Sequence, residues 1–120
     1  MLYSGNPLVN NSSSWYELYR VDADFDITYA VIELTKTYFY FDHYTPSSDS
    51  ISSLVGNSIT LVHADEYNAY ITAYGSPYLY WRIRLNGNAF VCEVKWGHSN
   101  AAGAGTFQSN VINGIITFYA

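Results

Sequence analysis

Short runs of alternating side chains, separated by clusters of turn-forming residues, most constrain the fold of this 120-residue chain. Val, Ile, Thr, Tyr, Phe and Trp dominate the runs, and no segment sustains the 3.6-residue period of an amphipathic helix. We expect strands at residues 2–4, 15–21, 27–34, 36–44, 58–63, 69–74, 78–85, 89–96 and 111–119. Clusters rich in Gly, Pro, Asn and Ser separate them at 10–14, 46–53, 75–77, 86–88 and 97–105. The pattern predicts an all-β fold, an antiparallel β-sandwich of jelly-roll type, as a single domain over residues 1–120.

Residues 78–96 carry the clearest local pattern, a β-hairpin turning at Asn86-Gly87. A two-residue type I′ turn there gathers apolar side chains on one face, with the pairs Leu85–Asn88, Ile83–Phe90, Trp81–Cys92 and Leu79–Val94. The other face would pair Arg84–Ala89, Arg82–Val91, Tyr80–Glu93 and Tyr78–Lys95. A slip of one residue would destroy this sorting. Cys92 is therefore expected in the core, as a structural thiol rather than a nucleophile.

The stretch TKTYFYFDHY at 35–44 carries aromatic rings on both faces of one predicted strand. One face, suited to the core, would hold Phe39, Phe41 and His43. The other would hold Lys36, Tyr38, Tyr40, Asp42 and Tyr44. A tyrosine can bury its apolar ring and keep its hydroxyl in water. Such a face therefore suits a partly hydrated contact with a partner better than full exposure to solvent. The sequence thus predicts two Tyr-rich faces, one here and one on the hairpin.

Charge and cysteine content exclude several classes of partner. The chain has 10 acidic and 5 basic residues, a net charge of −5, so no cationic patch for nucleic acid or an anionic bilayer is expected. It has no apolar run of about 18 residues and no signal-peptide pattern at its start, so we expect a soluble domain without membrane insertion. Its single cysteine forms no internal disulfide, which favours folding in a reducing compartment.

No motif of catalysis or cofactor binding occurs, so we expect a non-enzymatic protein without a cofactor. Two carboxylate pairs, Asp65 with Glu66 and Asp42 with Glu93, could in principle serve a glycosidase. Adjacent strand residues point to opposite faces, so we interpret Asp65-Glu66 as a polar turn. His63 and Asp65 could share one side of an extended chain, but two ligands do not make a metal site. A metal site at a histidine near a symmetry axis, with further ligands from other subunits, stays open as an alternative.

The abundance of tyrosine favours a binding function. Carbohydrate sites combine rings, which stack on the apolar faces of sugars, with a few polar groups that bind hydroxyls. The chain has 13 Tyr and 3 Trp. The candidate ligand-binding residues are Tyr40, Asp42, Tyr44, Tyr78, Tyr80, Trp96, His98 and Asn100. An equally physical interpretation is that the rings fill a sheet interior or a subunit interface, where Tyr is enriched.

Three stretches resemble a known family. LYSGNP at 2–7 and VDADFDITYAVIEL at 21–34 resemble the C-terminal domains of bacteriophage tail-fibre and baseplate proteins, and NGIITFYA at 113–120 is similar to their last strand. The resemblance covers about the first third of the chain and its last residues. It implies a β-sandwich receptor-binding or tip domain, usually a homotrimer. Such domains attach a virion to a surface glycan or protein of a bacterium.

The sequence therefore predicts a receptor- or glycan-binding domain of a phage tail fibre or related virion attachment protein. It would be made in the bacterial cytoplasm and act on the virion tail as a homotrimer. Three alternatives stay open: a structural virion or oligomerisation module without a ligand, a stand-alone lectin, and a small glycoside-processing enzyme.

Overall fold

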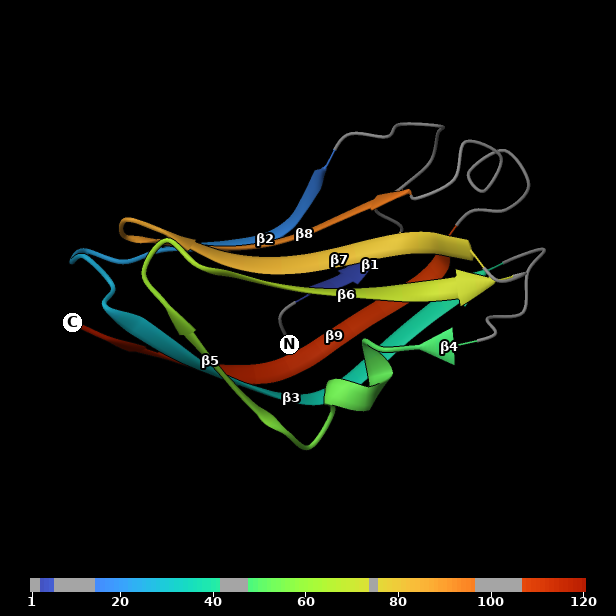
Figure 1. Ribbon diagram of the computed structural model, residues 1–120, viewed down its shortest axis with the longest axis horizontal. Helices are drawn as coiled ribbons and strands as arrows, with labels where there is room; N and C mark the ends of the chain where they lie inside the picture. Colours follow the sequence, from blue (N-terminus) through green and yellow to red (C-terminus); the bar gives the residue numbers. More distant parts are fainter. Residues whose placement is uncertain (1–2, 6–14, 42–47, 74–75, 97–106) are drawn as a thin grey trace.

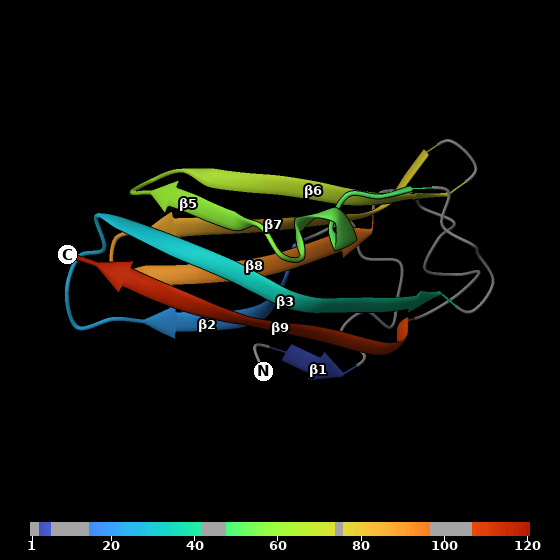
Figure 2. The same ribbon diagram turned by 90° about the horizontal axis from the view of Figure 1, so that it is seen from below.

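Two antiparallel sheets face each other in the computed structural model of the chain (Figures 1 and 2). The structure describes residues 3–5, 15–41, 48–73, 76–96 and 107–120. The four-stranded sheet has the order β1 (Tyr3–Gly5), β9 (Phe107–Tyr119), β3 (Tyr29–Phe41), β5 (Ser58–Val62). The five-stranded sheet has the order β2 (Tyr16–Asp22), β8 (Ala89–Trp96), β7 (Ser76–Asn86), β6 (Glu66–Ala73), β4 (Ser48–Asp49). The predicted antiparallel β-sandwich is confirmed.

Strand β3 joins two stretches that the sequence predicts as separate strands, 27–34 and 36–44. Its pairing with β9 shifts register between Leu34 and Lys36, so that one extra residue, Thr35, forms a bulge. Ile32 and Leu34 are buried before the bulge, whereas Lys36 and Tyr38 are exposed after it. The predicted break was wrong because a bulge inverts the side-chain alternation while the strand continues. The side chains of residues 39–41, and all of residues 42–44, lie outside the described part of the chain.

The predicted turn cluster at 46–53 overlaps two short elements, strand β4 and the 3-10 turn η1 (Ser52–Leu54). The carboxylate of Asp49 organises them, because it accepts hydrogen bonds from the backbone N–H groups of Ile51 at 3.0 Å and Ser52 at 2.9 Å. An aspartate side chain that accepts hydrogen bonds from nearby backbone N–H groups favours a turn over a continued strand. The turn places the fully buried side chain of Ile51 in the core.

The hairpin of β7 and β8 has the predicted faces but not the predicted register. Asn86 pairs with Ala89, so the central turn residues are Gly87 and Asn88. Gly87 has φ +63°, and Asn88 has no positive φ, the pattern of a type II′ rather than a type I′ turn. The apolar pairs become Leu85–Phe90, Ile83–Cys92, Trp81–Val94 and Leu79–Trp96. A shift of two residues preserves parity, so the predicted apolar face still meets the core.

On the other face of the hairpin, the pairs become Asn86–Ala89, Arg84–Val91, Arg82–Glu93 and Tyr80–Lys95. The predicted pair of Tyr80 with Glu93 was therefore wrong. The reason is the same: only the glycine takes the positive φ without a Cβ penalty, so the turn centres one residue later than predicted. This shift brings an arginine opposite the buried glutamate.

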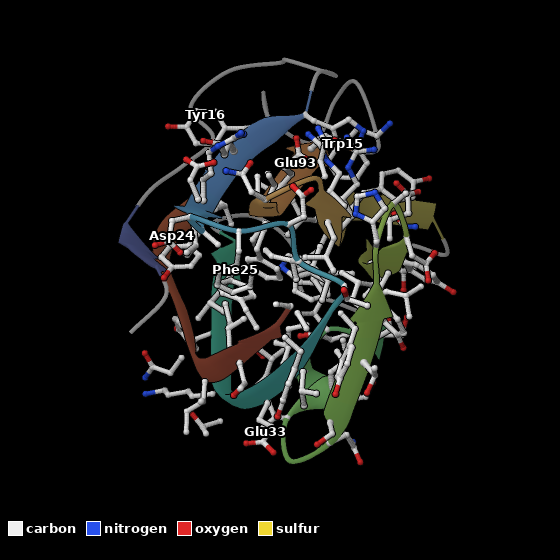
Figure 3. The ribbon with its side chains drawn as sticks, turned by 90° about the vertical axis from the view of Figure 1, so that its left-hand side faces the viewer. Trp15, Tyr16, Asp24, Phe25, Glu33 and Glu93 are labelled. Atoms are coloured by element: carbon white, nitrogen blue, oxygen red, sulfur yellow. The ribbon has the colours of Figure 1, made fainter. Side chains whose placement is uncertain are left out.

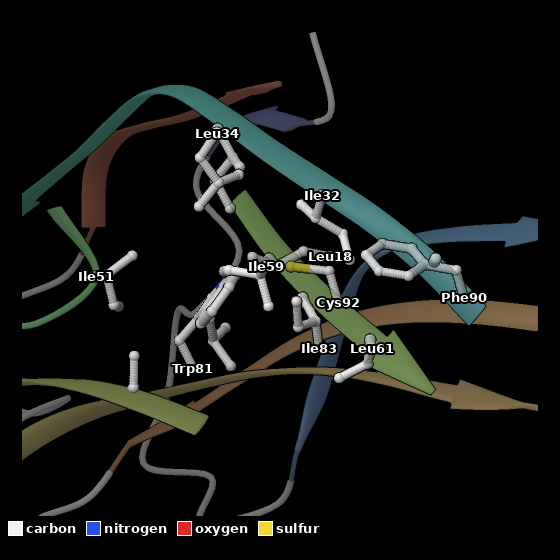
Figure 4. Close-up of a cluster of buried hydrophobic side chains, with 14 of the residues drawn as sticks. Leu18, Ile32, Leu34, Ile51, Ile59, Leu61, Trp81, Ile83, Phe90 and Cys92 are labelled. Carbon is white, nitrogen blue, oxygen red and sulfur yellow. The ribbon is translucent and has the colours of Figure 1, made fainter. Parts of the chain in front are cut away.

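The core lies between the two sheets (Figure 4). Its largest fully buried side chains include Trp81 and Phe90 from the five-stranded sheet and Ile32 and Leu34 from β3. Cys92 lies among them at 2% exposure, as predicted. Burial raises the pKa of its thiol to about 12, and the neighbouring Trp81 indole opposes only part of this shift. The thiol is therefore un-ionised at neutral pH.

Gly114 marks the closest approach of β9 to β3 and supports a first prediction. A Cβ at this position would lie 2.7 Å from the backbone oxygen of Glu33 and 3.2 Å from the Cα of Leu34. Because these are backbone atoms next to the bulge, relief would disturb the central ladder. We expect Gly114→Ala to lower the free energy of unfolding by about 2 kcal/mol, measured by urea denaturation. Thr117→Val, an exposed position on the same strand, should stay within about 0.5 kcal/mol. An alanine variant as stable as the parent would contradict this account of the strand contact.

Candidate functional site

The outer face of the five-stranded sheet gathers rings and charges from four parts of the chain. Trp81 and Ile83 of β7 are buried, so the residues between and beside them, Tyr80, Arg82 and Arg84, point outward. We call this surface the Trp15 face, and it comprises Trp15, Asn68, Tyr70, Tyr80, Arg82, Arg84, Glu93 and Lys95. In Figure 3, which views the sandwich end-on, Trp15 and Glu93 lie on one side and Glu33 of the other sheet lies on the opposite side.

A charge cluster centred on Glu93 forms the floor of the Trp15 face. Its Oε1 atom accepts hydrogen bonds from Arg82 Nε at 2.9 Å and Arg84 Nε at 2.7 Å. Arg82 Nη1 also lies 3.9 Å from Glu66 Oε2. The Glu93 side chain is only 9% exposed. Its burial acts to raise the pKa of the carboxyl, but the hydrogen bonds and charges of Arg84 and Arg82 outweigh this and hold the pKa below its ordinary value. Glu93 is therefore ionised at neutral pH.

The ring of Trp15 lies beside two cations. Arg82 Cζ is 4.0 Å from its centroid, and Lys95 Nζ is 4.8 Å from it. Lys95 Nζ also lies 5.5 Å from the centroid of Tyr80, the residue opposite it in the ladder. Such contacts hold a cation against a ring face. They connect Trp15, which precedes β2, to the hairpin of β7 and β8.

Tyr70 and Tyr80 are neighbouring tyrosines on this face. They lie directly opposite each other on β6 and β7. Tyr70 is 45% exposed and Tyr80 is half-buried. Asn68 is the next outward residue of β6, opposite Arg82, and its amide donates to Glu66 Oε1 at 3.2 Å. The arrangement offers flat rings, phenol hydroxyls, an amide and an ammonium group along one surface, the mixture that stacks on a sugar ring and bonds its hydroxyls.

The structure places only part of the predicted site. Tyr80 lies on the Trp15 face, and the backbones of Tyr78 and Trp96 lie in the same sheet, on β7 and β8. Tyr40 lies on β3, in the opposite sheet. The side chains of Tyr40, Tyr78 and Trp96 lie outside the described part of the chain, as do Asp42, Tyr44, His98 and Asn100 entirely. Of the predicted residues whose backbone is described, Tyr40 belongs to one sheet and Tyr78, Tyr80 and Trp96 belong to the other.

Sequence reasoning missed Trp15, Asn68, Tyr70 and Lys95 as site residues. In the ladder of β6 with β7, Tyr70 lies opposite Tyr80 and Asn68 lies opposite Arg82, and the ring of Trp15 contacts Arg82 and Lys95. Lys95 could have been found from the hairpin alone, because the correct turn places it opposite Tyr80.

The segment HADEY at 63–67 is a turn followed by the start of β6, which agrees with the polar-turn interpretation of Asp65. Asp65 N donates to Val62 O at 3.1 Å, and Asp65 Oδ1 accepts from Glu66 N at 2.9 Å. Ala64, which precedes Asp65 in this turn, has φ +62°. Within the described ranges, no group of three or more His, Cys, Asp or Glu residues is placed to hold a metal ion. The same ranges contain no helix long and apolar enough to cross a membrane.

Comparison with known proteins finds no significant match for this chain. No family model matches the chain, and no curated protein or solved structure is significantly similar to it. Inference about function therefore rests on the residues of the Trp15 face and on the sequence resemblance.

Proposed function

We propose that this chain is a non-enzymatic recognition domain that binds a glycan through the Trp15 face. The observation that carries the proposal is the cross-strand pair of Tyr70 and Tyr80, with Asn68 and Lys95 beside it. The attachment role, as a receptor-binding domain of a phage tail fibre or related virion protein, is supported by the resemblance at 2–7, 21–34 and 113–120. The ligand would then be a polysaccharide of the bacterial surface.

The rigidity of the face supports binding to a sugar. Tyr70 and Tyr80 stand on paired strands, and Glu93 accepts hydrogen bonds from both Arg82 and Arg84 on the same face. A preordered surface loses little conformational entropy when it binds, so modest stacking contacts still contribute net affinity. Tyrosine adds large contact area with few rotatable bonds.

The protonation states of Glu93 and Cys92 support binding rather than catalysis. A glycosidase needs a carboxylic acid whose pKa is raised, so that it can protonate the leaving oxygen. Glu93 has the opposite shift, because two guanidinium groups stabilise its carboxylate. The Cys92 thiol is buried in the core, and its pKa of about 12 makes it unsuitable as a nucleophile.

Alanine variants of the ring pair test the proposal. We expect Tyr70→Ala and Tyr80→Ala each to weaken binding of a bacterial surface polysaccharide about 10-fold to 100-fold in calorimetric titration, as for central aromatic contacts elsewhere. The matched control is Tyr67→Ala. Tyr67 is on the same strand and 38% exposed, but it pairs with the buried Ile83 and therefore lies off the Trp15 face.

Three outcomes would each count against part of the proposal. If both variants remain folded and bind as the parent does, the Trp15 face is not the site. If melting collapses while binding per folded molecule persists, Tyr80 serves packing alone. A parent that binds no glycan would favour the alternative of a structural virion module.

A further inference from the structure

The outer face of the four-stranded sheet is unusually apolar for a surface. We call it the Tyr29 face; its described side chains are Tyr29, Val31, Glu33, Lys36, Tyr38, Ser58, Thr60, Val62, Asn113, Ile115, Thr117 and Tyr119. Five of the nine exposed large hydrophobic or aromatic side chains in the described part of the chain lie on it: Tyr29, Tyr38, Val62, Ile115 and Tyr119. Ile115 is 59% exposed. Such a concentration of exposed apolar side chains on one face indicates an interaction surface.

The strand pairings arrange these side chains in ordered rows. Tyr29 is flanked by Val62 on β5 and Tyr119 on β9. The rings of Tyr29 and Tyr119 are stacked, with centroids 4.4 Å apart and planes 10° from parallel. The next row is Thr60, Val31 and Thr117. These short or flat side chains present a smooth surface that a second flat surface can cover.

The charge on this face points to a second copy of the chain as its occupant. Its described residues include one acid, Glu33, and one base, Lys36, so that face is neutral while the whole chain carries −5. Two copies repel each other overall, and a neutral face is where that repulsion is smallest. Glu33 and Lys36 are also the last outward residue of β3 before the bulge and the first after it.

We propose that two copies of the chain pack their Tyr29 faces together about a two-fold axis. The axis lies in the plane of the face, perpendicular to β3, and crosses that strand between Glu33 and Lys36. Rotation about it places Glu33 of each copy opposite Lys36 of the other, so one self-complementary patch forms two ion pairs. The two sheets then stack with nearly aligned strands, the usual geometry of packed sheets.

The size of the face is compatible with such a contact. β3 and β9 have 13 residues each and β5 has 5. At about 3.4 Å per residue and about 4.8 Å between strands, these three strands cover roughly 500 Å² in plan. Side chains standing on the plane raise the accessible area toward the roughly 800 Å² per partner of a standard interface. We therefore expect a dimer that dissociates on dilution rather than a permanent one.

This pairing goes beyond the proposed function and does not depend on it. It covers the Tyr29 faces and leaves both Trp15 faces exposed on the outside of the dimer. Two sites on one particle would strengthen attachment to a repetitive surface glycan. It also differs from the homotrimer that the resemblance implies, because a self-complementary face closes at two copies.

Charge-swap variants test the pairing by sedimentation equilibrium across micromolar concentrations. We expect the parent to approach twice the chain mass of 13.5 kDa at high concentration. Glu33→Lys and Lys36→Glu each place like charges opposite each other twice, and should weaken dimerisation about 100-fold. The double swap restores the pairs in reversed order and the parent's net charge, so it should regain most of the affinity.

Both swapped positions are exposed, so the fold should persist, and circular dichroism checks this. A parent that is monomeric throughout, or that reaches three times the chain mass, overturns the proposal. So do single swaps that associate as the parent does, or a double swap that stays dissociated. Glycan binding is measured separately, so failure here leaves the proposed function untouched.

Discussion

Replacing Trp81 with alanine is expected to lower the free energy of unfolding by about 4 kcal/mol, the largest loss predicted for this chain. The indole is 1% exposed in the middle of the core, and it pairs with the fully buried Val94. Truncation removes the transfer free energy of a large ring and leaves a cavity that neighbouring strands, fixed by their ladders, cannot fill. Urea denaturation monitored by circular dichroism measures the loss.

Two further variants separate ring volume from position. Trp81→Phe keeps most of the ring and removes an N–H without a normal hydrogen-bond partner, so we expect a loss below about 2 kcal/mol. Tyr80→Ala, one residue away on the opposite face of β7, should cost less than about 1 kcal/mol. Equal losses at positions 80 and 81 would contradict the placement of the core.

The second large effect is expected at Glu93. Removing its carboxylate in Glu93→Ala leaves Arg82 and Arg84 close together, with Glu66 at 3.9 Å from Arg82 as the next acid in the cluster. Loss of one partner from a buried ion pair costs about 3–5 kcal/mol. Because the guanidinium side chains are 20% and 30% exposed, they can turn partly to water, and we expect about 2–3 kcal/mol by urea denaturation. Glu17→Gln, in the exposed pair with Arg20, should change stability by less than about 1 kcal/mol.

The pH dependence of stability provides an independent check on Glu93. Its carboxyl has a lower pKa in the folded chain than its ordinary value, so the unfolded state binds the proton more readily. The stabilisation is therefore complete above the ordinary pKa and is lost as the pH falls through the folded pKa. The difference in melting temperature between parent and Glu93→Gln should be greatest near neutral pH and shrink below about pH 5. A difference that grows on acidification would contradict the ion-pair account.

The fold class was predictable because each strand carries its own alternation, which is a local property. β8 was predicted at its observed bounds, whereas β3 was divided at Thr35, because the sequence alone does not distinguish an extra residue from a strand end. The β7–β8 register depended on which residue of Asn86-Gly87-Asn88 takes positive φ. The assignment of side chains to the inner and outer faces was still correct, because the register shifted by two residues, an even number.

The candidate site was less predictable, because it depends on the exact register between neighbouring strands and on a contact with Trp15, which is distant in sequence. Tyr80 could be chosen from the hairpin alone. Tyr70 lies opposite it on β6, the strand that precedes β7 in the chain. Trp15 lies just before β2, and only the sheet order brings it to the same face. The pairing of Arg82 with Glu93 required the correct register. The described parts of the two predicted faces, Lys36 with Tyr38 and Tyr80 with the two arginines, belong to opposite sheets, so the proposed recognition and the proposed self-association use different surfaces.

The most direct test of glycan recognition is a nuclear magnetic resonance titration of the chain, with isotope-labelled tyrosine rings, against bacterial surface polysaccharides. The account predicts that a bound glycan shifts the ring signals of Tyr70 and Tyr80 and leaves those of Tyr29 and Tyr119 unchanged. Ring signals that respond on the Tyr29 face instead, or tyrosines that respond to no polysaccharide tested, would contradict recognition through the Trp15 face.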